Sequence, residues 1–429
     1  MSTHSPTSHG PVKDPNGDLE ANPRPSTSSS FPTSMYPDSL HARLSHFTWG
    51  WYTLSMATGG LALLLHPNTQ PHDFSGLLTI GKVVFIIDLV LFTTITAAIT
   101  CRFLSNPGTF QASLTHPTES LFASTSLISL ASIIASIAHY GIPECGPWLI
   151  TAVRVVFWIF YAVSWLSAIV QYVHLFTNPS LRIQDMTPAW DLPIFPVMLT
   201  GTVASAAAPF QPAYQAVPMI VAGTLAQGLG FLVSILMYAS YLRRMIQYGF
   251  PSPGSRPAMF IAVGPPSFTG LALIGMANAW PADHYDFFGD AEMTRVALRI
   301  ISFVTAVFIW SLGFWFFCIA VASTLMVARE LKFKLNWNAF VFPNVGFTIA
   351  TIEIGRVLRS EGVLWLGSVM TVLLVGLYLF VQVMCVRAVL NKTILFEGCD
   401  EDVYHTERKV KSEKRAATGG TIGGNEKEE

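Results

Sequence analysis

Charged residues are scarce in this sequence. Lys, Arg, Asp and Glu together make up 12% of its 429 residues, about half the share found in soluble domains. A chain with so few charges cannot cover a folded surface of this size with polar side chains. Hydrophobic residues make up 51% of the chain, and its mean hydropathy is +0.47. The composition therefore excludes an ordinary soluble domain and predicts an integral membrane protein surrounded by the lipid bilayer.

An excess of one charge sign is also absent. The formal net charge is −1, so the sequence offers no basic surface for nucleic acid, and we expect no nucleic-acid partner. The cysteines are scattered and form no CxxC pair, so we expect no metal site, no disulfide framework and no cofactor. There are five of them: Cys101, Cys145, Cys318, Cys385 and Cys399.

Motifs of catalysis are missing as well. We find no GxSxG elbow, HExxH pair, P-loop or GxGxxG turn in a suitable context. Histidine and aspartate do not cluster inside the apolar segments, as they usually do in membrane enzymes. The sequence therefore argues against an enzyme. Because we find no ATP-binding module, we expect any active transport to depend on an ion gradient or on the gradient of the substrate itself.

The two ends differ in composition from the rest. Residues 1–41 are rich in Ser, Thr and Pro and have no early apolar core, so they predict a disordered cytosolic tail and not a signal peptide. Residues 391–429 are charged and Gly-rich and predict a second disordered cytosolic tail. Residues 42–390 consist of apolar runs with short polar breaks, which we interpret as one transmembrane transport domain.

Ten stretches of this domain are long and apolar enough to span a bilayer, which requires about 20 residues. The fifth is short and interrupted by Pro193 and Pro196, and the eighth is long enough to extend beyond the hydrocarbon. We therefore expect an all-α integral membrane fold with ten transmembrane helices. Their expected ranges are 45–65, 77–101, 119–139, 148–174, 191–208, 218–242, 258–280, 294–328, 336–358 and 362–390.

The charges of the loops orient these segments. Lys and Arg follow the second, fourth, sixth and eighth segments, whereas the loops after the first, third and fifth have neither. The loop after the seventh is acidic, and the loop after the ninth, with Arg356 and Arg359, is an exception. The positive-inside rule then predicts that both termini lie in the cytosol. The orienting cations are Arg102, Arg182, Arg243, Arg244, Arg256, Arg329, Lys332 and Lys334.

Glycine or proline interrupts four of the five odd-numbered segments, whereas the third carries a series of serines. Proline frees a backbone carbonyl, which lipid tolerates only where protein or a water-filled cavity satisfies it. Matching breaks in alternate helices therefore favour a central pathway, although Gly and Pro are also common in membrane helices generally. The interrupting residues are Gly59 and Gly60; Pro196 and Gly201; Pro265, Pro266 and Gly270; and Pro343 and Gly346. The serines are Ser124, Ser126, Ser129, Ser132 and Ser136.

Several ordered strings carry a family resemblance over about residues 42–390. The chain resembles the tellurite-resistance/dicarboxylate transporter family, and within it the fungal malic acid, or C4-dicarboxylate, transporters. Fungal sulfite efflux pumps share this fold. The strings are HFTW at 46–49 and MATGG at 56–60, PAW at 188–190 and LPIFP at 192–196, VGPP at 263–266 and GLALI at 270–274, and FPNVGF at 342–347 and TIEIG at 351–355.

The resemblance implies a fold, an assembly and a gate. Family members have ten helices arranged as five hairpins with pseudo-fivefold symmetry, in which the odd helices line a central pore and the even helices form an outer ring. They assemble as trimers with one pore per protomer, so we expect a homotrimer. Family structures also place a Phe of the ninth helix across the pore, and Phe342, just before Pro343, matches it. The alternative for Phe342 is an ordinary packing ring, since the sequence contains 30 Phe.

Polar residues at or beside the helix breaks are candidates for the substrate path. Hydroxyl and amide donors suit a carboxylate that must bind and then leave, and the N-termini of broken helices add partial positive charge. Each residue has an alternative as a helix cap or as a small packing residue. The candidates are Thr58, Thr200, Ser267, Thr269 and Asn344.

Charged residues inside membrane segments are costly and are therefore functional candidates. Arg154 matches an Arg of the malate transporters and is able to clamp a carboxylate; the alternative is a structural ion pair with Asp88 or Glu353. Lys82 is a second candidate cation of the path, unless it only snorkels to the interface. Glu353 is the candidate for proton coupling near the outer mouth, and Arg356, three residues later, offers it an intrahelical partner.

Together these features predict a fungal plasma-membrane transporter of C4-dicarboxylates such as malate, succinate and fumarate. Transport through the gated pore is either proton-coupled or channel-like. The alternative is a sulfite efflux pump or another small-anion channel of the same fold. A dicarboxylate needs two cationic or donor groups along the path, whereas sulfite needs one. The strings at 188–196 and 342–355 favour the dicarboxylate.

Overall fold

Helices form all the regular structure in the described part of the chain. The computed structural model describes residues 43–116, 118–177, 182–282 and 290–395. These described residues all belong to one compact unit. The tail predicted for 1–41 also lies outside the described residues, as does the tail predicted for 391–429 apart from 391–395.

Short and long helices alternate along the described chain. The long ones are α3 (Leu77–Ser105), α7 (Trp148–Thr177), α9 (Ala213–Tyr248), α11 (Ala291–Leu325) and α13 (Glu361–Leu390). The segments before and between them are η1 (Trp49–Trp51) and α2 (Tyr52–Leu64); α4 (Thr109–Thr115), α5 (Glu119–Phe122), α6 (Ser124–Ser136) and η2 (Ile137–Gly141); η3 (Ile183–Asp185), η4 (Pro188–Ile194), α8 (Phe195–Ala207) and η5 (Ala208–Phe210); η6 (Pro253–Val263) and α10 (Gly264–Asn278); and η7 (Leu335–Phe340) and α12 (Phe342–Leu358).

Within the described residues, nine helical stretches are long and apolar enough to cross a membrane. Each corresponds to one of the segments predicted as the second to the tenth. The first predicted segment, 45–65, forms η1 and α2, which together are shorter than the other nine. The chain is therefore a multi-pass, all-helical membrane protein, as its composition predicted.

Five of the short segments pack into a closed ring. α2 contacts α6 and α12, α8 contacts α6 and α10, and α10 also contacts α12. We name α2, α6, α8, α10 and α12, with the short helices that lead into them, the inner ring. In the four of these segments that are long enough to span a membrane, 72–83% of the most apolar stretch is buried inside the protein.

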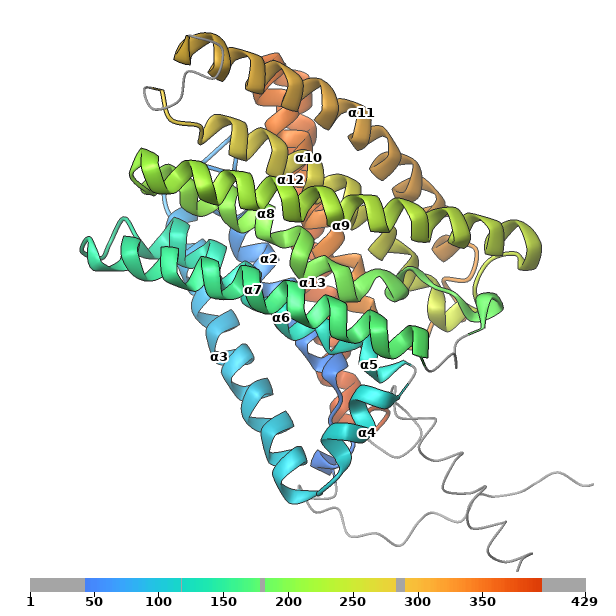
Figure 1. Ribbon diagram of the computed structural model, residues 1–429. Coiled ribbons are helices and arrows are strands. Elements are labelled where there is room, and N and C mark those ends of the chain that lie inside the picture. Colours follow the sequence, from blue (N-terminus) through green and yellow to red (C-terminus); the bar gives the residue numbers. More distant parts are fainter. Residues whose placement is uncertain (1–42, 117, 178–181, 283–289, 396–429) are drawn as a thin grey trace, which may run out of the picture. The chain divides into compact units, whose positions relative to one another are not determined.

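The five long helices surround the inner ring, and we name them the outer helices. Each contacts the inner-ring helix that precedes it in the chain. Only 17–44% of their most apolar stretch is buried, and their free faces carry large apolar side chains such as Leu166, Phe308 and Leu373. Figure 1 shows α3, α7, α9 and α11 along the outside, with α2, α6 and α8 between them. Apolar faces of this extent are unfavourable in water and fit the lipid of a bilayer.

Proline begins the α-helical part of three inner-ring segments. Pro196, Pro265 and Pro343 lie in the first turns of α8, α10 and α12. Proline is tolerated there because the N–H groups of a first turn have no partner within their own helix. A 3-10 helix precedes each of these turns, namely η4, η6 and η7. The breaks predicted at the prolines of the fifth, seventh and ninth segments are therefore confirmed, and each is a junction between a 3-10 helix and an α-helix. The interruptions predicted at Gly201, Gly270 and Gly346 are wrong, because α8, α10 and α12 continue through them.

The glycines of the first segment do not break it. α2 runs without interruption through Gly59 and Gly60, so the prediction of a break there is wrong. Glycine keeps its backbone hydrogen-bonding groups, and packing holds it inside a helix at a cost of about 1 kcal/mol. The two glycines instead allow side chains of neighbouring helices to approach α2 closely. A Cβ atom on Gly60 would lie 2.9 Å from Cδ2 of Phe342, and one on Gly59 would lie 2.5 Å from Oδ2 of Asp88.

Candidate functional site

Two small cavities lie inside the inner ring. The first has a volume of about 10 Å³, and all five inner-ring helices contribute to its wall. One lining residue from each helix is Leu63 of α2, Ser132 of α6, Thr202 of α8, Phe268 of α10 and Phe342 of α12. A cavity to which every helix of a closed ring contributes lies at the centre of that ring.

The second cavity has a volume of about 20 Å³ and lies further along the same axis. The same five segments line it, through Thr53, Thr125, Phe195, Ile261 and again Phe342. In four of the segments the lining residue precedes its counterpart in the first cavity by about two helical turns or more, roughly 10 Å of rise. The two cavities are therefore stacked along the ring axis.

The side chain of Phe342 separates the two cavities. It lines both of them and is 3% exposed. Its ring stacks on that of Phe268, with the ring centroids 4.9 Å apart, and α2 approaches it closely at Gly60. A cavity needs about 10–15 Å³ to hold one water molecule, so neither cavity has room for an organic anion. In the described conformation Phe342 thus lies in the wall of two cavities that are too small for such an anion.

Local hydrogen bonds hold the backbone beside Phe342. Nδ2 of Asn344 donates to the carbonyl oxygen of Phe340 at 2.9 Å, and the hydroxyl of Thr348 donates to the carbonyl oxygen of Asn344 at 2.7 Å. Oδ1 of Asn344 is buried and has no hydrogen-bond partner among the described residues. This free group is an acceptor, whereas an anion needs a donor. Nδ2 carries two N–H groups and the bond to Phe340 uses one of them, so Asn344 is able to donate to an anion through the other.

The four hydroxyl candidates are buried and engaged within the protein. Three of them donate to the carbonyl oxygen four residues earlier in their own helix, at 2.8 Å for Thr58, 3.3 Å for Thr200 and 2.6 Å for Ser267. The fourth, Thr269, accepts a hydrogen bond of 2.8 Å from Nε2 of Gln227 in α9. In the described conformation three of the hydroxyl protons are therefore engaged within their own helices, whereas the contact of Thr269 uses its oxygen as an acceptor.

Two of the charged candidates are in ion pairs. Nζ of Lys82 lies 2.8 Å from Oε1 of Glu144, in the turn before α7, and the Lys82 ammonium lowers the pKa of Glu144 below its usual value. Glu353 lies 2.6 Å from Arg356, one turn later in α12. The intrahelical pair considered for Glu353 is therefore confirmed. Arg356 also donates to the carbonyl oxygen of Gln70 at 3.1 Å, which ties α12 to the chain that follows α2.

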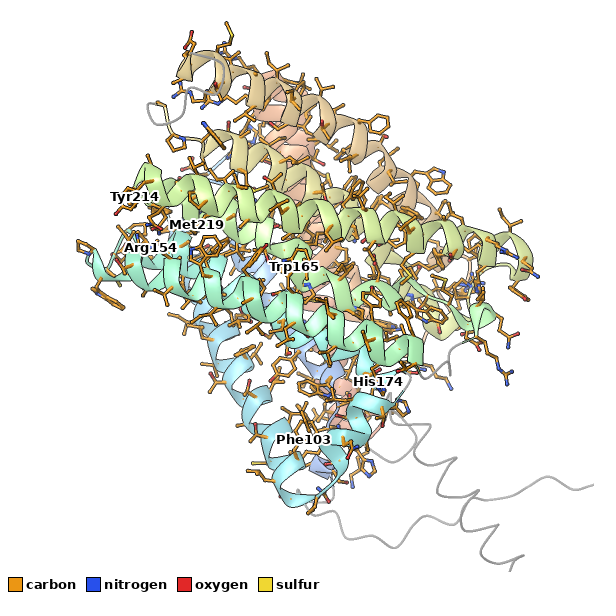
Figure 2. All side chains as sticks on the ribbon, viewed as in Figure 1. Phe103, Arg154, Trp165, His174, Tyr214 and Met219 are labelled. Atoms are coloured by element: carbon orange, nitrogen blue, oxygen red, sulfur yellow. The ribbon has the colours of Figure 1, made fainter. Side chains whose placement is uncertain are left out.

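Arg154 belongs to the outer helix α7. It is half-buried and lies toward the end of α7 opposite His174, as Figure 2 shows. The alternative of an ion pair with Asp88 or Glu353 is wrong. Oδ1 of Asp88 accepts from Ser55 and its Oδ2 has no hydrogen-bond partner among the described residues, while Glu353 pairs with Arg356. Arg154 is not part of either cavity wall.

Phe342 is the sequence candidate that lines the cavities, and the other candidates lie around them. Polar lining residues that the sequence reasoning missed include Thr125, Ser132 and Thr202. The signal for one of them was present, because Ser132 is part of the serine series of the third segment. Thr125 lies seven residues before Ser132 and therefore shares its helix face. The emphasis on Gly and Pro breaks directed attention to the helix junctions and away from this face.

The walls of both cavities are uncharged. An anion at the centre of the ring therefore depends on dipoles for its stabilisation. Phe195 begins α8, Phe342 begins α12, and both line the second cavity. The positive ends of these two helix dipoles consequently border the second cavity, which favours a negative ligand there.

Comparison with known proteins shows which sequences this chain is similar to. Residues 46–386 match the family described as voltage-dependent anion channels. The malic acid transport protein of Schizosaccharomyces pombe is 38% identical over 368 residues, which cover 85% of this chain and 83% of that protein. The sulfite efflux pump of Arthroderma benhamiae is 25% identical over 366 residues, which cover 84% of this chain and 93% of that protein. These matches confirm the resemblance that the sequence strings predicted.

Proposed function

Because the chain belongs to the voltage-dependent anion channel family, we propose that it transports C4-dicarboxylates such as malate, succinate and fumarate across the plasma membrane. The observation that carries this proposal is the pair of cavities stacked along the axis of the inner ring, with walls from all five ring segments. The 38% identity to a malic acid transport protein supports the choice of substrate.

The proposed architecture is ten transmembrane helices arranged as five hairpins with pseudo-fivefold symmetry about a central pore. The closed ring of contacts from α2 to α12 supports it, as does the packing of each outer helix on the inner-ring helix before it. η1 and α2 supply the tenth crossing in this proposal. A short helix suffices there because ring neighbours, and not lipid, surround it.

We further propose that both termini lie in the cytosol and that three copies of the chain assemble as a homotrimer with one pore each. Basic residues gather at one end of the helices, at the end of α3, at the end of α9 and after α11, which supports this orientation. They include Arg102, Arg243, Arg244, Lys332 and Lys334.

Phe342 is the proposed gate. Rotation of its ring away from the axis would join the two cavities that it separates, and α2 offers no side chain at Gly60 to oppose the movement. Opening would also widen the path toward the polar groups around the cavities. In the open state the substrate would exchange hydrogen bonds with Thr58, Thr200, Ser267, Thr269 and Asn344.

The charged candidates have proposed roles nearer the ends of the path. Lys82 and Arg154 attract the two carboxylates of the substrate, and Glu353 accepts a proton that travels with it. The ion pairs of Lys82 with Glu144 and of Glu353 with Arg356 must then break or loosen during transport. Transport without these rearrangements would be channel-like and driven by the gradient of the anion.

Uptake of radiolabelled malate into proteoliposomes tests the proposed function. We expect uptake in the presence of a malate gradient and competition by succinate and fumarate. Running the assay with and without a pH gradient separates proton-coupled from channel-like transport. The assignment fails if the reconstituted protein takes up no malate under either condition.

Sulfite efflux is the second candidate function. The 25% identity to a sulfite efflux pump favours it, as do the uncharged cavity walls, which suit an anion that needs fewer donor groups. In the same proteoliposomes, sulfite flux without malate flux would select this alternative. Malate flux that excess sulfite leaves unchanged would reject it.

A further inference from the structure

Asp88 is a buried acid that the proposed path leaves unused. It lies midway along α3 and is 0% exposed. Oδ1 accepts a hydrogen bond of 2.6 Å from the hydroxyl of Ser55. Oδ2 has no hydrogen-bond partner among the described residues. A carboxyl group inside a membrane segment with one hydrogen bond is costly, which marks Asp88 as a functional group and not a packing residue.

The free oxygen of Asp88 faces a hydroxyl group of the central cavity. A Cβ atom on Gly59 would lie 2.5 Å from Oδ2 of Asp88 and 2.4 Å from Oγ of Ser132, so both oxygens border the space that this glycine leaves open. Ser132 also lines the first cavity beside Phe342. Its hydroxyl donates to the carbonyl oxygen of Ser129 at 2.8 Å, which leaves its lone pairs free to accept a hydrogen bond. Gly59 and Ser132 therefore connect the buried acid to the path.

The surroundings of Asp88 supply no cation from the described residues. α3 packs against α2, α4 and α6, and α4 has no titratable side chain. Tyr378 of α13 interacts electrostatically with Asp88 and is bonded to Thr58. Lys82, on α3 itself, is paired with Glu144. Arg102, near the end of α3, is paired with Glu119. Tyr52 of α2 bonds to Thr96, and Tyr140 of η2, which continues α6, bonds to the carbonyl oxygen of Ala62. His139, also on η2, lies beside His66, with the ring centroids 5.0 Å apart. A proton is therefore the counter-charge that this geometry offers.

We propose that Asp88 is a proton-binding residue of the transporter and that its proton exchanges with the central path through Ser132. This inference rests on the proposed anion transport. When water fills the first cavity, a hydronium ion gives a proton to Oγ of Ser132 while Ser132 passes its own proton to Oδ2 of Asp88. One O–H bond forms on Asp88 for each one that breaks on the hydronium ion, and the serine hydroxyl is regenerated. The reverse sequence releases the proton, so an anion and a proton share one route.

Measuring whether protons enter together with malate tests this role. Proteoliposomes containing a pH-sensitive dye report proton entry during malate uptake, at a pH above both ionisations of malic acid, where the substrate carries no proton of its own. We expect the wild type to move protons with malate. Asp88→Asn, which has the shape of the neutral acid, is expected to lose proton entry while malate exchange at equal pH continues. Asp73→Asn, at an exposed position before α3, is the matched control and should behave as the wild type does.

Three outcomes would overturn the role of Asp88. The first is as many protons per malate in Asp88→Asn as in the wild type, and the second is loss of proton entry in Glu353→Gln but not in Asp88→Asn. The third is malate flux in the wild type that no proton entry accompanies. This result would reject the role of Asp88 and still agree with the proposed malate transport. Absence of malate flux in the wild type would instead contradict the proposed function.

Infrared spectroscopy of the purified protein keeps the proposal testable if Asp88→Asn does not fold. The carbonyl band of a protonated carboxylic acid should appear and disappear as the pH changes in the wild type, and its midpoint should move in Ser132→Ala, which removes the facing oxygen. A band that shows no change over the whole range of pH in which the protein is folded would make Asp88 a fixed structural acid and overturn the proposal.

Discussion

The inner-ring segments and the outer helices differ in how apolar and how buried they are. The difference is opposite to that between the interior and the surface of a soluble protein. In the most apolar stretch, the mean hydropathy is 1.2–1.9 for the four inner-ring segments that qualify as spans and 1.9–2.4 for the outer helices. The segments that the protein buries most are thus the less apolar ones. In a bilayer the solvent is hydrocarbon, so the outer helices carry the apolar surface and the interior is free to hold polar groups.

This difference explains where a path for an anion can run. The outer helices present continuous apolar faces that would repel a carboxylate. The inner ring carries buried hydroxyls such as Thr125, Ser132 and Thr202 at its centre, together with the first turns of α8 and α12. The comparison therefore predicts that changes inside the ring alter folding or transport, whereas similar changes on the outer faces do not.

The largest expected loss of stability comes from breaking the ion pair that joins an outer helix to an inner-ring segment. Arg102, near the end of α3, pairs with Glu119 at the start of the third segment, and both side chains are almost completely buried. Arg102→Ala leaves the Glu119 carboxylate buried without its partner, which we expect to lower the free energy of unfolding by about 3–5 kcal/mol. Denaturation with SDS in mixed micelles measures it.

The control for this prediction is the pair of Arg295 with Glu292 on the outer helix α11, in which the carboxylate is 62% exposed. Arg295→Ala should change the unfolding free energy by less than about 1 kcal/mol. Equal effects of the two substitutions would contradict the contrast between buried and exposed positions.

Two glycines of α9, Gly228 and Gly230, lie on different faces of the helix. A Cβ atom on Gly230 would lie 2.4 Å from Cβ and 2.9 Å from Cα of Met198 in α8, whereas one on Gly228 meets no atom within 4 Å. Gly230→Ala should therefore destabilise the protein by about 1–3 kcal/mol through overpacking. Gly228→Ala should be neutral or stabilising by up to about 1 kcal/mol, because alanine favours the helix. Thermal unfolding in detergent compares them, and a loss of stability in Gly228→Ala would show that this face is not free.

A histidine at the end of the first inner-ring segment predicts a dependence on pH. Burial lowers the pKa of His66 below its usual 6.5, against a smaller opposing effect of a hydrogen bond with the backbone of His139. As the pH falls below 6.5, the unfolded chain therefore binds protons more readily than the folded protein, and acidification destabilises the fold. The loss amounts to about 1.4 kcal/mol for each unit by which the two pKa values differ.

His66→Gln should remove this part of the acid destabilisation. Unfolding curves recorded from neutral to acidic pH, for the wild type and the variant, measure the difference. Identical slopes of stability against pH in the two proteins would mean that His66 takes up its proton as easily when folded as when unfolded.

The smallest effect is expected for the pair of Lys82 and Glu144. The Lys82 ammonium lowers the pKa of Glu144 below its usual 4.5. The corresponding stability is present above pH 4.5 and is lost as the pH falls through the lowered value. Because Glu144 is exposed to solvent, we expect Glu144→Gln to change the melting temperature little at neutral pH. Malate uptake gives the sharper readout, because Lys82 is a proposed cation of the path and freeing it should change the uptake at low substrate concentration.

Much of the fold could be predicted from the sequence because membrane helices are long and apolar. Nine predicted segments correspond to described helices, and Pro196, Pro265 and Pro343 marked real junctions, because proline constrains the backbone locally. Gly59 and Gly60 misled the prediction, since a glycine is compatible with a bend and with close packing alike. Whether the helix bends at such a glycine depends on neighbours such as Asp88 and Phe342, which are distant in sequence.

The candidate site could be predicted only in part for the same reason. Phe342 was found through the family strings, and the structure places it between the two cavities. Partners such as Ser132 and Phe268 come from other segments, and no local pattern specifies which side chains meet at the axis. The charge of Arg154 suggested a place in the path, yet α7 places it on an outer helix.

Malate flux through a variant of Phe342 tests most directly the claim that transport runs through the centre of the inner ring. Phe342→Ala removes the ring that separates the two cavities, and Phe308→Ala removes one of the same size from the outer face of α11, where it is 77% exposed. The account predicts a severalfold rise in malate flux for Phe342→Ala and no change for Phe308→Ala. Wild-type flux in a folded Phe342→Ala protein would contradict a path closed at this residue.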